Sequence, residues 1–486
     1  MVLKGGKKME VKLLGVTNEE YIKKEVQICA AAGKLSRMPG TVFDAYTSMS
    51  DYEKALKFIK MVIGMGHTST IDHDYMVFAL SGVTPVVEQT IIAERFSSFT
   101  IKSRREVDFS RVGFYTPDFH TEDGSISPDN ELLKEKYNEY MQSLFDSYEY
   151  FVSSGITKED ARFVLPYSYH SEIIMGLDGT SLARMISLLT KTKYSNITEL
   201  KELGESLKKI SETRAPYIDT VVDKEPIVLE SETERILKDL GITKEYDLLD
   251  EPILLSHTDN LDETIFINAI ARISGKSVHD AKLMYDKLIK NNDELKAKLM
   301  KSIFNEVNHE DLRQVNMRFQ FAVPYAILTH FTRHRRLSLS IPDFAPNNDL
   351  LKYTTPPKIK QNDGLNQKYE EIFRKNKEIW EEFKSYNIKE EDLVYFTLSG
   401  NTINIIINFD GEAFRWICRL RECTKAQWCI RNIVTKMHEL IGEVSTYYSA
   451  NLGPDCVTKH ICGEGKESCG RLKLILKKEG LNNEKR

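Results

Sequence analysis

Apolar residues recur every three or four positions in several stretches of this 486-residue chain, which is the spacing of one face of an α-helix. The spacing predicts helices over Tyr52–Ile63, Asn130–Val152, Asp280–Glu306 and Lys368–Phe383. Alternating or continuous apolar runs predict strands over Val11–Leu14, Tyr75–Leu80, Tyr246–Leu249 and Met317–Val323. Two stretches rich in Pro, Asn, Asp and Gly predict loops over Gly113–Asp129 and Pro342–Gly364. Helices and strands together predict an α+β fold.

The predicted elements occur twice because the sequence itself repeats. Residues Tyr148–Leu189 align with Trp380–Arg421 without a gap, and apolar positions match apolar ones. The identities include Glu149/Glu381, Phe151/Phe383, Ser153/Ser385, Ile156/Ile388, Glu159/Glu391, Asp160/Asp392, Ile173/Ile405, Ile174/Ile406, Asp178/Asp410 and Gly179/Gly411. Chance does not supply so many identities in one register, so we infer a tandem duplication.

The duplication predicts two similar domains, each a β-sheet flanked by helices. We assign residues 1–225 to copy one, 226–242 to a linker, 243–450 to copy two and 451–486 to a cysteine-rich tail that ends in lysines. A weaker echo of Glu10–Leu14 in Glu245–Leu249 gives each copy an opening strand. Because the copies differ in sequence, one site can be built from two unlike halves.

The charge pattern narrows the classes of partner. The net charge is −5 and no basic tract is present, which argues against nucleic acid as the main partner. No apolar stretch reaches the roughly 18–20 residues of a membrane span, and no apolar core of a signal peptide follows the first residues. We therefore expect a cytoplasmic protein that does not enter membranes.

Six of the seven cysteines lie near the C-terminus, and only Cys29 stands apart. In a cytosolic chain such clustering indicates metal or redox chemistry rather than disulfides. Four thiolates form a candidate zinc site: Cys423, Cys456, Cys462 and Cys469. An iron–sulfur cluster and free thiols are alternatives, and His460 is a further possible ligand. Cys418 and Cys429 are interpreted as small packing residues.

Two motifs carry the other candidate chemistry. Arg333-His334-Arg335 precedes a segment with two serines, and cations beside hydroxyls suit a phosphate or an electron-rich carbonyl. The segment Arg415–Arg431 predicts a helix or a helix pair that brings Arg421, Gln427 and Arg431 near one another. An arginine and a neutral amide can recognise a planar ring through directed hydrogen bonds. Each motif also has a purely structural alternative. Arg333–Arg335 could be the basic end of a helix, and Arg415–Arg431 could be a packed helix whose arginines face solvent.

Together these motifs resemble those of the flavin-dependent thymidylate synthases (ThyX type), whose signature is Arg-His-Arg followed by a Ser-rich loop. Leu420-Arg421 and Ala426-Gln427-Trp428-Cys429-Ile430-Arg431 resemble the later Leu-Arg and Ala-Gln-Trp-x-Ile-Arg segments of that family. Gly66–His73 resembles its Gly-His-x-Ser-x-x-Glu-His segment. The resemblance covers both copies.

The resemblance implies an enzyme that methylates dUMP with methylenetetrahydrofolate, FAD and NADPH, and positions its reactants rather than using a nucleophile. It implies that Arg421 contacts uracil and is catalytic. Substrate binding is implied for Ser103, Arg105, Arg421 and Gln427, and cofactor binding for His73, Arg333, His334, Arg335 and Ser338. Because the family is a homotetramer of single copies, a duplicated chain implies a homodimer that mimics it.

Each copy departs from the family pattern, and the departures are complementary. Copy one has Ala93-Glu94-Arg95 in place of Arg-His-Arg, yet its next loop keeps Ser103 and Arg105. Copy two keeps Arg-His-Arg but has Asp343 and Ala345 in that loop. Copy one also has Leu189 and Ser195 where copy two has Arg421 and Gln427, and Thr180 and Glu412 replace the arginine of a family Asn-Ala-Arg turn.

We therefore expect a composite site. Copy one would supply His73, Ser103 and Arg105, and copy two would supply Arg333, His334, Arg335, Arg421 and Gln427. Two alternatives stay open. One is a non-catalytic flavin- or nucleotide-binding paralogue, either a pseudoenzyme or a regulatory subunit. The other is a structural subunit that completes the site of another protein.

Overall fold

The computed structural model describes residues 8–14, 19–36, 38–242, 247–332, 334, 337–342 and 350–480. The chain divides into two compact units, one of Met1–Glu245 with Asp343–Asn401 and the other of Tyr246–Pro342 with Thr402–Arg486. The units therefore cross the boundary between the copies, because one long helix of copy two belongs to the first unit. Among the described helices, none is long and apolar enough to cross a bilayer.

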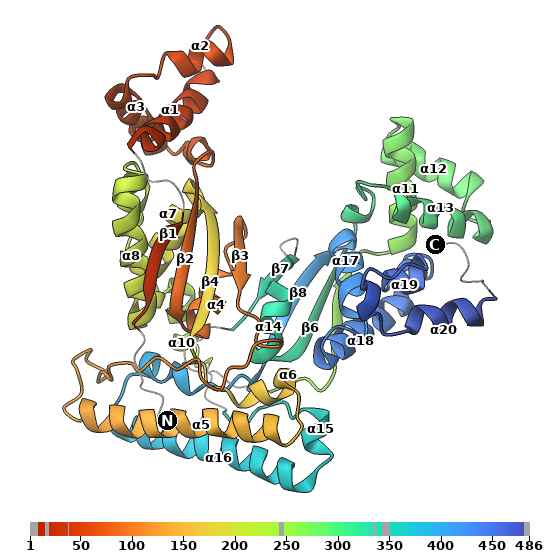
Figure 1. Cartoon of the computed structure of the whole chain (residues 1–486). Coiled ribbons are helices and arrows are strands. Elements are labelled where there is room, and N and C mark those ends of the chain that lie inside the picture. The colour runs from red at the N-terminus through yellow and green to blue at the C-terminus, as the bar shows by residue number, and fades with distance from the viewer. Residues whose placement is uncertain are drawn as a thin grey trace. The chain divides into compact units, whose positions relative to one another are not determined.

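The first unit contains an antiparallel sheet in the order β1-β2-β4-β3 (Figure 1). Its strands are β1 (Glu10–Leu14), β2 (Tyr75–Val83), β3 (Ser97–Ile101) and β4 (Ser171–Asp178). Side chains of β2 alternate between buried and less buried positions, as expected for a strand that packs one face on helices. Helices α7 (Gly179–Lys191) and α8 (Thr198–Arg214) contact β4 and β1, respectively.

The remaining elements of this unit surround the sheet and the long helices. The helices are α1 (Glu19–Leu35), α2 (Val42–Thr47), α3 (Tyr52–Gly64), α4 (Pro85–Ile91), α5 (Asn130–Ser153), α6 (Lys158–Ala161), α9 (Asp219–Val222), α10 (Glu232–Asp239), α15 (Pro357–Lys360) and α16 (Asp363–Ser385). The short 3₁₀ turns are η1 (Thr68–Ile71), η2 (Arg162–Val164), η3 (Lys193–Asn196), η5 (Glu390–Asp392) and η6 (Val394–Phe396).

The second unit repeats the architecture. Its sheet has the order β5-β6-β8-β7, from β5 (Ile253–His257), β6 (Asn316–Pro324), β7 (Leu337–Ser340) and β8 (Thr402–Asp410). Its helices are α11 (Leu261–Ser274), α12 (Val278–Leu288), α13 (Asp293–Asn305), α14 (Tyr325–Thr332), α17 (Gly411–Arg421), α18 (Trp428–Val444), α19 (Asp455–Thr458) and α20 (Arg471–Lys478), with turns η4 (Leu312–Gln314), η7 (Ser449–Asn451) and η8 (Gly465–Glu467). Two sheets of the same strand order agree with a tandem duplication.

A single extra residue distinguishes the two central strands. In β2, Ser81 pairs with Glu172 and Val83 pairs with Ser171, so Gly82 is an unpaired bulge. Its φ of 69° is a conformation that glycine adopts without steric cost. Strand β6 pairs with β8 without such an interruption. The copies therefore differ by one residue even inside the conserved sheet.

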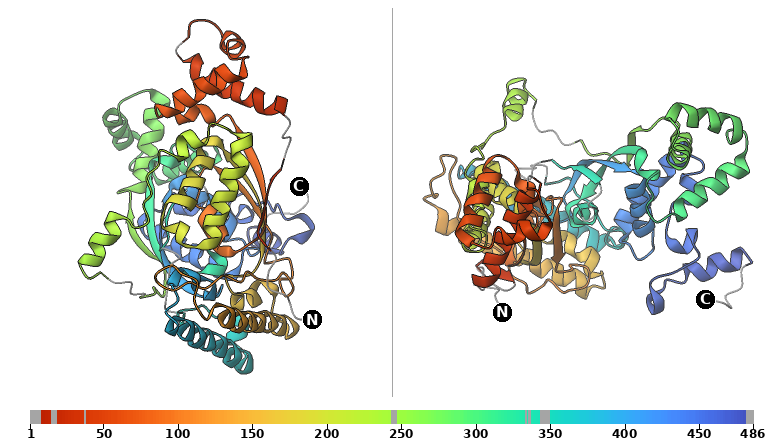
Figure 2. Two further views of the ribbon diagram at one scale, coloured as in Figure 1. Left: turned by 90° about the vertical axis from the view of Figure 1, so that its left-hand side faces the viewer. Right: turned by 90° about the horizontal axis from the view of Figure 1, so that it is seen from above.

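Helices α5 and α16 lie side by side within the first unit, and both views of Figure 2 are consistent with their packing. Aromatic and aliphatic side chains at helical spacing are buried along both helices. The buried polar groups are paired, since the Tyr140 hydroxyl donates to Asn376 Oδ1 at 3.0 Å. Asn376 in turn donates to the Phe396 carbonyl at 2.8 Å. This helix pair joins copy one to copy two.

Backbone hydrogen bonds between the two copies are reciprocal. Tyr167 N–H donates to the Thr397 carbonyl at 2.8 Å, and Ser399 N–H donates to the Leu165 carbonyl at 2.9 Å. In the register of the duplication, Thr397 matches Leu165 and Ser399 matches Tyr167. Reciprocal contacts of this kind define an isologous, twofold interface. The two copies therefore meet here as two subunits of a symmetric dimer would.

Two sequence predictions need correction, and the predicted linker holds a helix that was not predicted. The opening strand of copy two is β5, which begins after Pro252; Asp247–Leu249 are irregular, and Tyr246 lies outside the described residues. The predicted helix Asp280–Glu306 is two helices, because the Asn292 side chain caps a new helix at Leu295 N–H. The predicted linker contains α10, whose start is a capping box of Ser231 and Glu234. The other predicted strands and helices are confirmed.

Candidate functional site

The two motifs of copy two meet at the end of α17. Arg421 is the last residue of that helix, and its Nε–H donates to His334 Nε2 at 3.3 Å. One Nη2–H donates to the His330 carbonyl, in α14, at 3.1 Å. Segments far apart in the sequence thus fix the plane of one guanidinium. Arg333 and Arg335, also predicted for this site, lie outside the described residues.

His334 is held in its neutral form. Burial, followed by the charge of Arg421, lowers its pKa to about 3. Because Nε2 accepts from Arg421, the ring proton resides on Nδ1. The pair therefore carries one positive charge, on a guanidinium that an uncharged imidazole orients.

A cavity of about 550 Å³ is bounded by His334 and by the exposed face of α17. Its lining residues are Val307, His309, Arg313, His334, Glu412, Ala413, Arg415, Trp416, Arg419 and Lys459. Four of these are permanently cationic side chains and one is a carboxylate. The Trp416 ring is 41% exposed and the Arg419 guanidinium lies 4.8 Å from its centroid. A cationic wall with an open indole suits an anion that carries a flat ring.

Part of this charge is neutralised inside the wall. Glu412, which replaces the family arginine, accepts hydrogen bonds from Arg415 Nε at 2.8 Å and Nη2 at 2.9 Å. Asp455 accepts from Arg419 Nε at 2.8 Å. In copy one the corresponding Thr180 hydroxyl donates to the Thr68 carbonyl at 3.0 Å. Neither copy therefore restores the missing arginine at its own position.

Two further predicted residues of copy two occupy different environments. Ser338 is exposed in β7, opposite Asn408 of β8. Gln427 is buried directly before α18. The helices α8 and α18 have equal length, and the residue directly before α8 is Ile197. The prediction that Ser195 is the counterpart of Gln427 is thus wrong, because the preceding connection is two residues longer in copy one.

The loop after β3 in copy one carries two arginines close to a third, Arg162. Ser103 is exposed in the turn after β3, and Arg105 forms an ion pair with Glu159. Arg104 pairs with the buried carboxylate of Glu88 at 2.8 Å. Arg162 is only 3% exposed, and burial together with Arg104 lowers its pKa to about 9. Sequence reasoning missed Arg104 and Arg162. For Arg162 a signal was available, because the aligned residue of copy two is the apolar Val394.

His73, the remaining prediction for copy one, is exposed in the turn before β2. Its neighbour Asp74 is buried and accepts from Arg214 Nη2 at 2.9 Å. Glu25 also pairs with Arg214, so one guanidinium serves two buried carboxylates. Burial raises the pKa of Asp74 to about 7. This cluster ties α1 and α8 to the start of β2 and places His73 on its surface.

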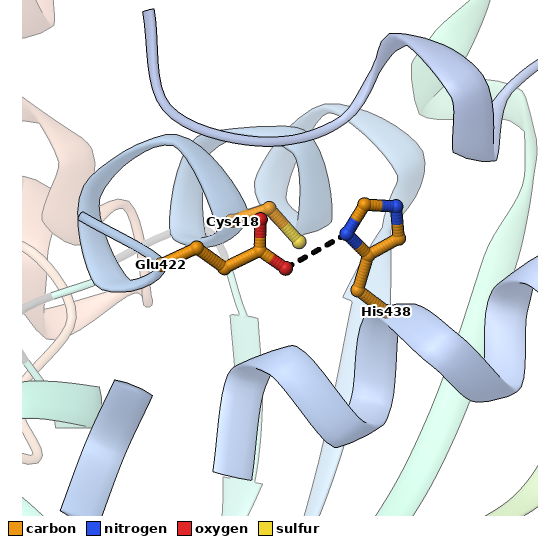
Figure 3. Close-up of side chains that lie close together, drawn as sticks. All are labelled: Cys418, Glu422 and His438. Carbon is orange, nitrogen blue, oxygen red and sulfur yellow. Dashed lines mark hydrogen bonds and ion pairs between the residues drawn. The ribbon is translucent and has the colours of Figure 1, made fainter. Parts of the chain in front are cut away.

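A Cys418–Glu422–His438 group lies close together in the second unit (Figure 3). The ligand atoms of these residues lie within 4.8 Å of one another. His438 Nδ1 is 2.7 Å from Glu422 Oε1, and Nε2 is 3.1 Å from the Ser449 carbonyl. Two acceptors require a proton on both ring nitrogens, and Glu422 accordingly raises the His438 pKa against the effect of burial. An imidazolium cannot ligate a metal, so we interpret the group as an ion pair beside a buried, protonated thiol.

The chain matches the family described as "Thymidylate synthase complementing protein" over residues 19–217 and again over residues 253–445. The chain belongs to this family. Both family matches fall on the copies inferred from the repeat, so each copy is a member in its own right. The predicted site residues lie within these matches, except for the three tail cysteines Cys456, Cys462 and Cys469, and the cavity residue Lys459 also lies outside them.

Several curated relatives are similar to this chain, and each is called flavin-dependent thymidylate synthase. The protein from Geobacter sulfurreducens is 28% identical over 131 residues, which is 27% of this chain and 54% of the relative. Those from Pyrococcus furiosus and Clostridium tetani are each 24% identical, over 36% and 43% of this chain and 70% and 86% of the relatives. The match thus spans only about half the length of the first relative. A solved UMP/dUMP methylase from Streptomyces cacaoi, bound with 5-Br dUMP, is 20% identical over 46% of this chain and 98% of that chain, with a TM-score of 0.38.

Proposed function

We propose that this chain is a flavin-dependent enzyme that methylates dUMP, with methylenetetrahydrofolate as carbon donor and NADPH as reductant. Membership of the thymidylate synthase complementing family supports the proposal. The observation that carries it is the Arg421–His334 pair, which meets at the wall of a cationic cavity. When bound, FAD supplies the reducing equivalents that complete the methyl group.

The residues of the cavity fit these ligands. Its volume of about 550 Å³ lies within the usual range for small-molecule sites. Trp416 offers a face for an aromatic ring, while Arg313 and Lys459 attract phosphates. Arg421, whose guanidinium is oriented by His334, can donate a hydrogen bond to a uracil carbonyl. These residues position reactants, and positioning alone supplies much of such a reaction's acceleration.

We also propose that copy one supplies the phosphate-binding part of the site, through Ser103 and Arg105. Arg162 adds a buried positive charge near Arg105, which stabilises a dianion. Arg105 forms an ion pair with Glu159 in the structure, so a phosphate would share or replace that carboxylate. If copy one of a second chain supplies these residues, two chains mimic a homotetramer. Half of its four sites would then be built from unlike copies.

Tritium release from [5-³H]dUMP, with all three cofactors present, tests the proposed reaction. We expect turnover by the full chain and at least a hundredfold loss in Arg421→Ala. Arg374→Ala is the matched control, because that arginine is exposed on α16 and pairs with Glu378 in the same helix. Normal turnover in Arg421→Ala would overturn the site assignment.

The composite arrangement has its own test. The Arg105→Ala chain and the Arg421→Ala chain are each expected to be inactive alone. The two variants are then mixed under conditions in which subunits exchange. Recovered activity would show that copy one and copy two contribute to a site from different chains. Absence of recovery, with exchange confirmed by native mass spectrometry, would place both contributions within one chain or refute the division.

A non-catalytic flavin- or nucleotide-binding protein is the second candidate function. The Glu412–Arg415 pair favours it, because a carboxylate now occupies the position of a family arginine. This function predicts that FAD and dUMP bind while tritium release stays at background. Catalysis by the purified full chain would eliminate it.

A further inference from the structure

The C-terminal segment Asp455–Gly480 has almost no hydrophobic support. None of its side chains is buried, and the elements α19, η8 and α20 are each eight residues or shorter. Segments this small rarely hold a fixed conformation through apolar burial alone, and commonly use a metal or disulfides instead. All seven cysteines are free thiols, so disulfides do not provide the support.

Polar contacts bring this segment against the connection between α17 and α18. Lys425 Nζ lies 3.5 Å from Glu467 Oε2, and Arg471 Nη1 donates to the Glu422 carbonyl at 3.3 Å. Cys423 lies between Glu422 and Lys425, and Cys469 lies between Glu467 and Arg471. These two contacts therefore hold the segments that contain the two thiols against each other.

The other two thiols approach the same place. Cys462 Sγ lies 3.6 Å from the Ser468 hydroxyl, next to Cys469. Cys456 follows Asp455, whose carboxylate holds Arg419 one helical turn before Cys423. Cys456 lies close enough to the other three thiols and to Arg471 to interact with each of them electrostatically. His460 is excluded from the group by its ion pair with Glu479 at 2.9 Å.

We propose that Cys423, Cys456, Cys462 and Cys469 bind one Zn²⁺ ion as tetrahedral thiolates and so anchor the C-terminal segment to the end of α17. Four thiolates in a site without an open position are the ligand set of structural zinc. Thr424 and Arg471 flank the group, and the Thr424 side chain forms a hydrogen bond with Cys469.

The site has a structural consequence for a neighbouring cavity of about 800 Å³. Its wall includes Thr424 from the α17–α18 connection together with Pro454, Val457 and Arg471 from the C-terminal part. Zinc would close this wall by joining its two sides. It would also fix the chain two residues after Arg421, independently of whether flavin binds.

Metal analysis of the full-length protein, expressed with added zinc and purified without chelator, tests the proposal. We expect about one zinc per chain, falling at least fivefold in Cys456→Ser and Cys469→Ser. Cys429→Ala is the matched control, because that thiol is buried in α18 and should leave the zinc content unchanged. Iron with acid-labile sulfide, or zinc that survives in all four single variants, would overturn the assignment.

Limited trypsin digestion gives a second readout that does not depend on variants. The segment carries Lys459, Lys466 and Arg471 as exposed or half-exposed cleavage sites. Zinc should protect them in the wild-type chain, and a chelator should increase the cleavage rate at least tenfold, reversed by added zinc. Equal cleavage with and without chelator would contradict an anchoring metal.

Discussion

The same helix face lines a cavity in both copies, but its positive charges stand at different positions, Arg184 and Lys191 in α7 and Arg415 and Arg419 in α17. Helices α7 and α17 correspond in the ungapped repeat, and each contributes to a cavity, of about 330 Å³ and about 550 Å³ respectively. The aligned substitutions on this face are Ala183 to Arg415, Arg184 to Trp416 and Ser187 to Arg419. Both copies also hold arginines in buried ion pairs, Arg104 and Arg214 in copy one and Arg415 in copy two. Corresponding helices thus carry different charge patterns on one backbone.

The largest effect is expected where copy one buries charge. Arg214→Ala leaves the carboxylates of Asp74 and Glu25 buried without their cation, which should lower the free energy of unfolding by about 3–5 kcal/mol. Urea unfolding followed by circular dichroism measures the loss. Arg374→Ala should change stability by less than about 1 kcal/mol. A small effect of Arg214→Ala would show that the copy-one arginines are not structural.

In copy two, removal of a positive charge should affect activity more than stability. Arg421→Ala should reduce kcat by about 10²–10³, because it removes oriented donors at the substrate. The melting temperature should change little, since Arg421 is only half-buried at the end of α17. A variant that melts early and keeps its kcat would reverse the comparison between the copies.

Glu199 of copy one should make the folding stability depend on pH. Burial raises its pKa from 4.5 to about 7, against hydrogen bonds from Thr84 and Tyr395. The folded state therefore binds the proton more tightly, and this contribution to stability, complete below pH 4.5, is lost as the pH rises through 7. The loss is at most about 3 kcal/mol. Glu199→Gln should flatten the stability profile between pH 5 and 8, whereas Glu131→Gln, at an exposed site, should leave it unchanged.

The smallest expected effect concerns ligand affinity. Trp416→Ala should weaken FAD or dUMP binding about tenfold, the contribution of one exposed aromatic face beside a cation. Titration of the flavin absorption band measures it. The aligned variant Arg184→Ala, on the corresponding face of α7, should have no effect. Equal losses in both variants would indicate that the two cavities are equivalent.

Much of the fold could be predicted from periodicity, because buried faces repeat at the spacing of their elements. Strand β2 and helix α5 are examples, and the repeat predicted a second copy of each. The break near Asn292 and the strand that starts after Pro252 were missed, since both depend on single capping or turn residues inside apolar sequence. Local signals of this kind compete with a longer periodic pattern and are outweighed by it.

The candidate site, like the fold, could be predicted only in part. The motif resemblance assigned His334 and Arg421 to one site, but it predicted neither their contact nor the cationic cavity beside them. Arg313 and Lys459 come from separate segments, and nothing in their local sequence indicates that a common cavity unites them. For Arg162, the mismatch with Val394 marks the position but not its burial, because an arginine has the same local pattern whether it is solvated or enclosed.

The reciprocal hydrogen bonds between Leu165–Tyr167 and Thr397–Ser399 bear on how the copies could diverge. In a dimer of identical chains every substitution at a twofold contact occurs twice, so its cost is doubled. Covalent duplication removes that penalty, because a change at Tyr167 leaves Ser399 intact. It also keeps the two surfaces at a high effective concentration, so a weakened contact still forms. Mutations too damaging for a symmetric ancestor thus become tolerable one side at a time.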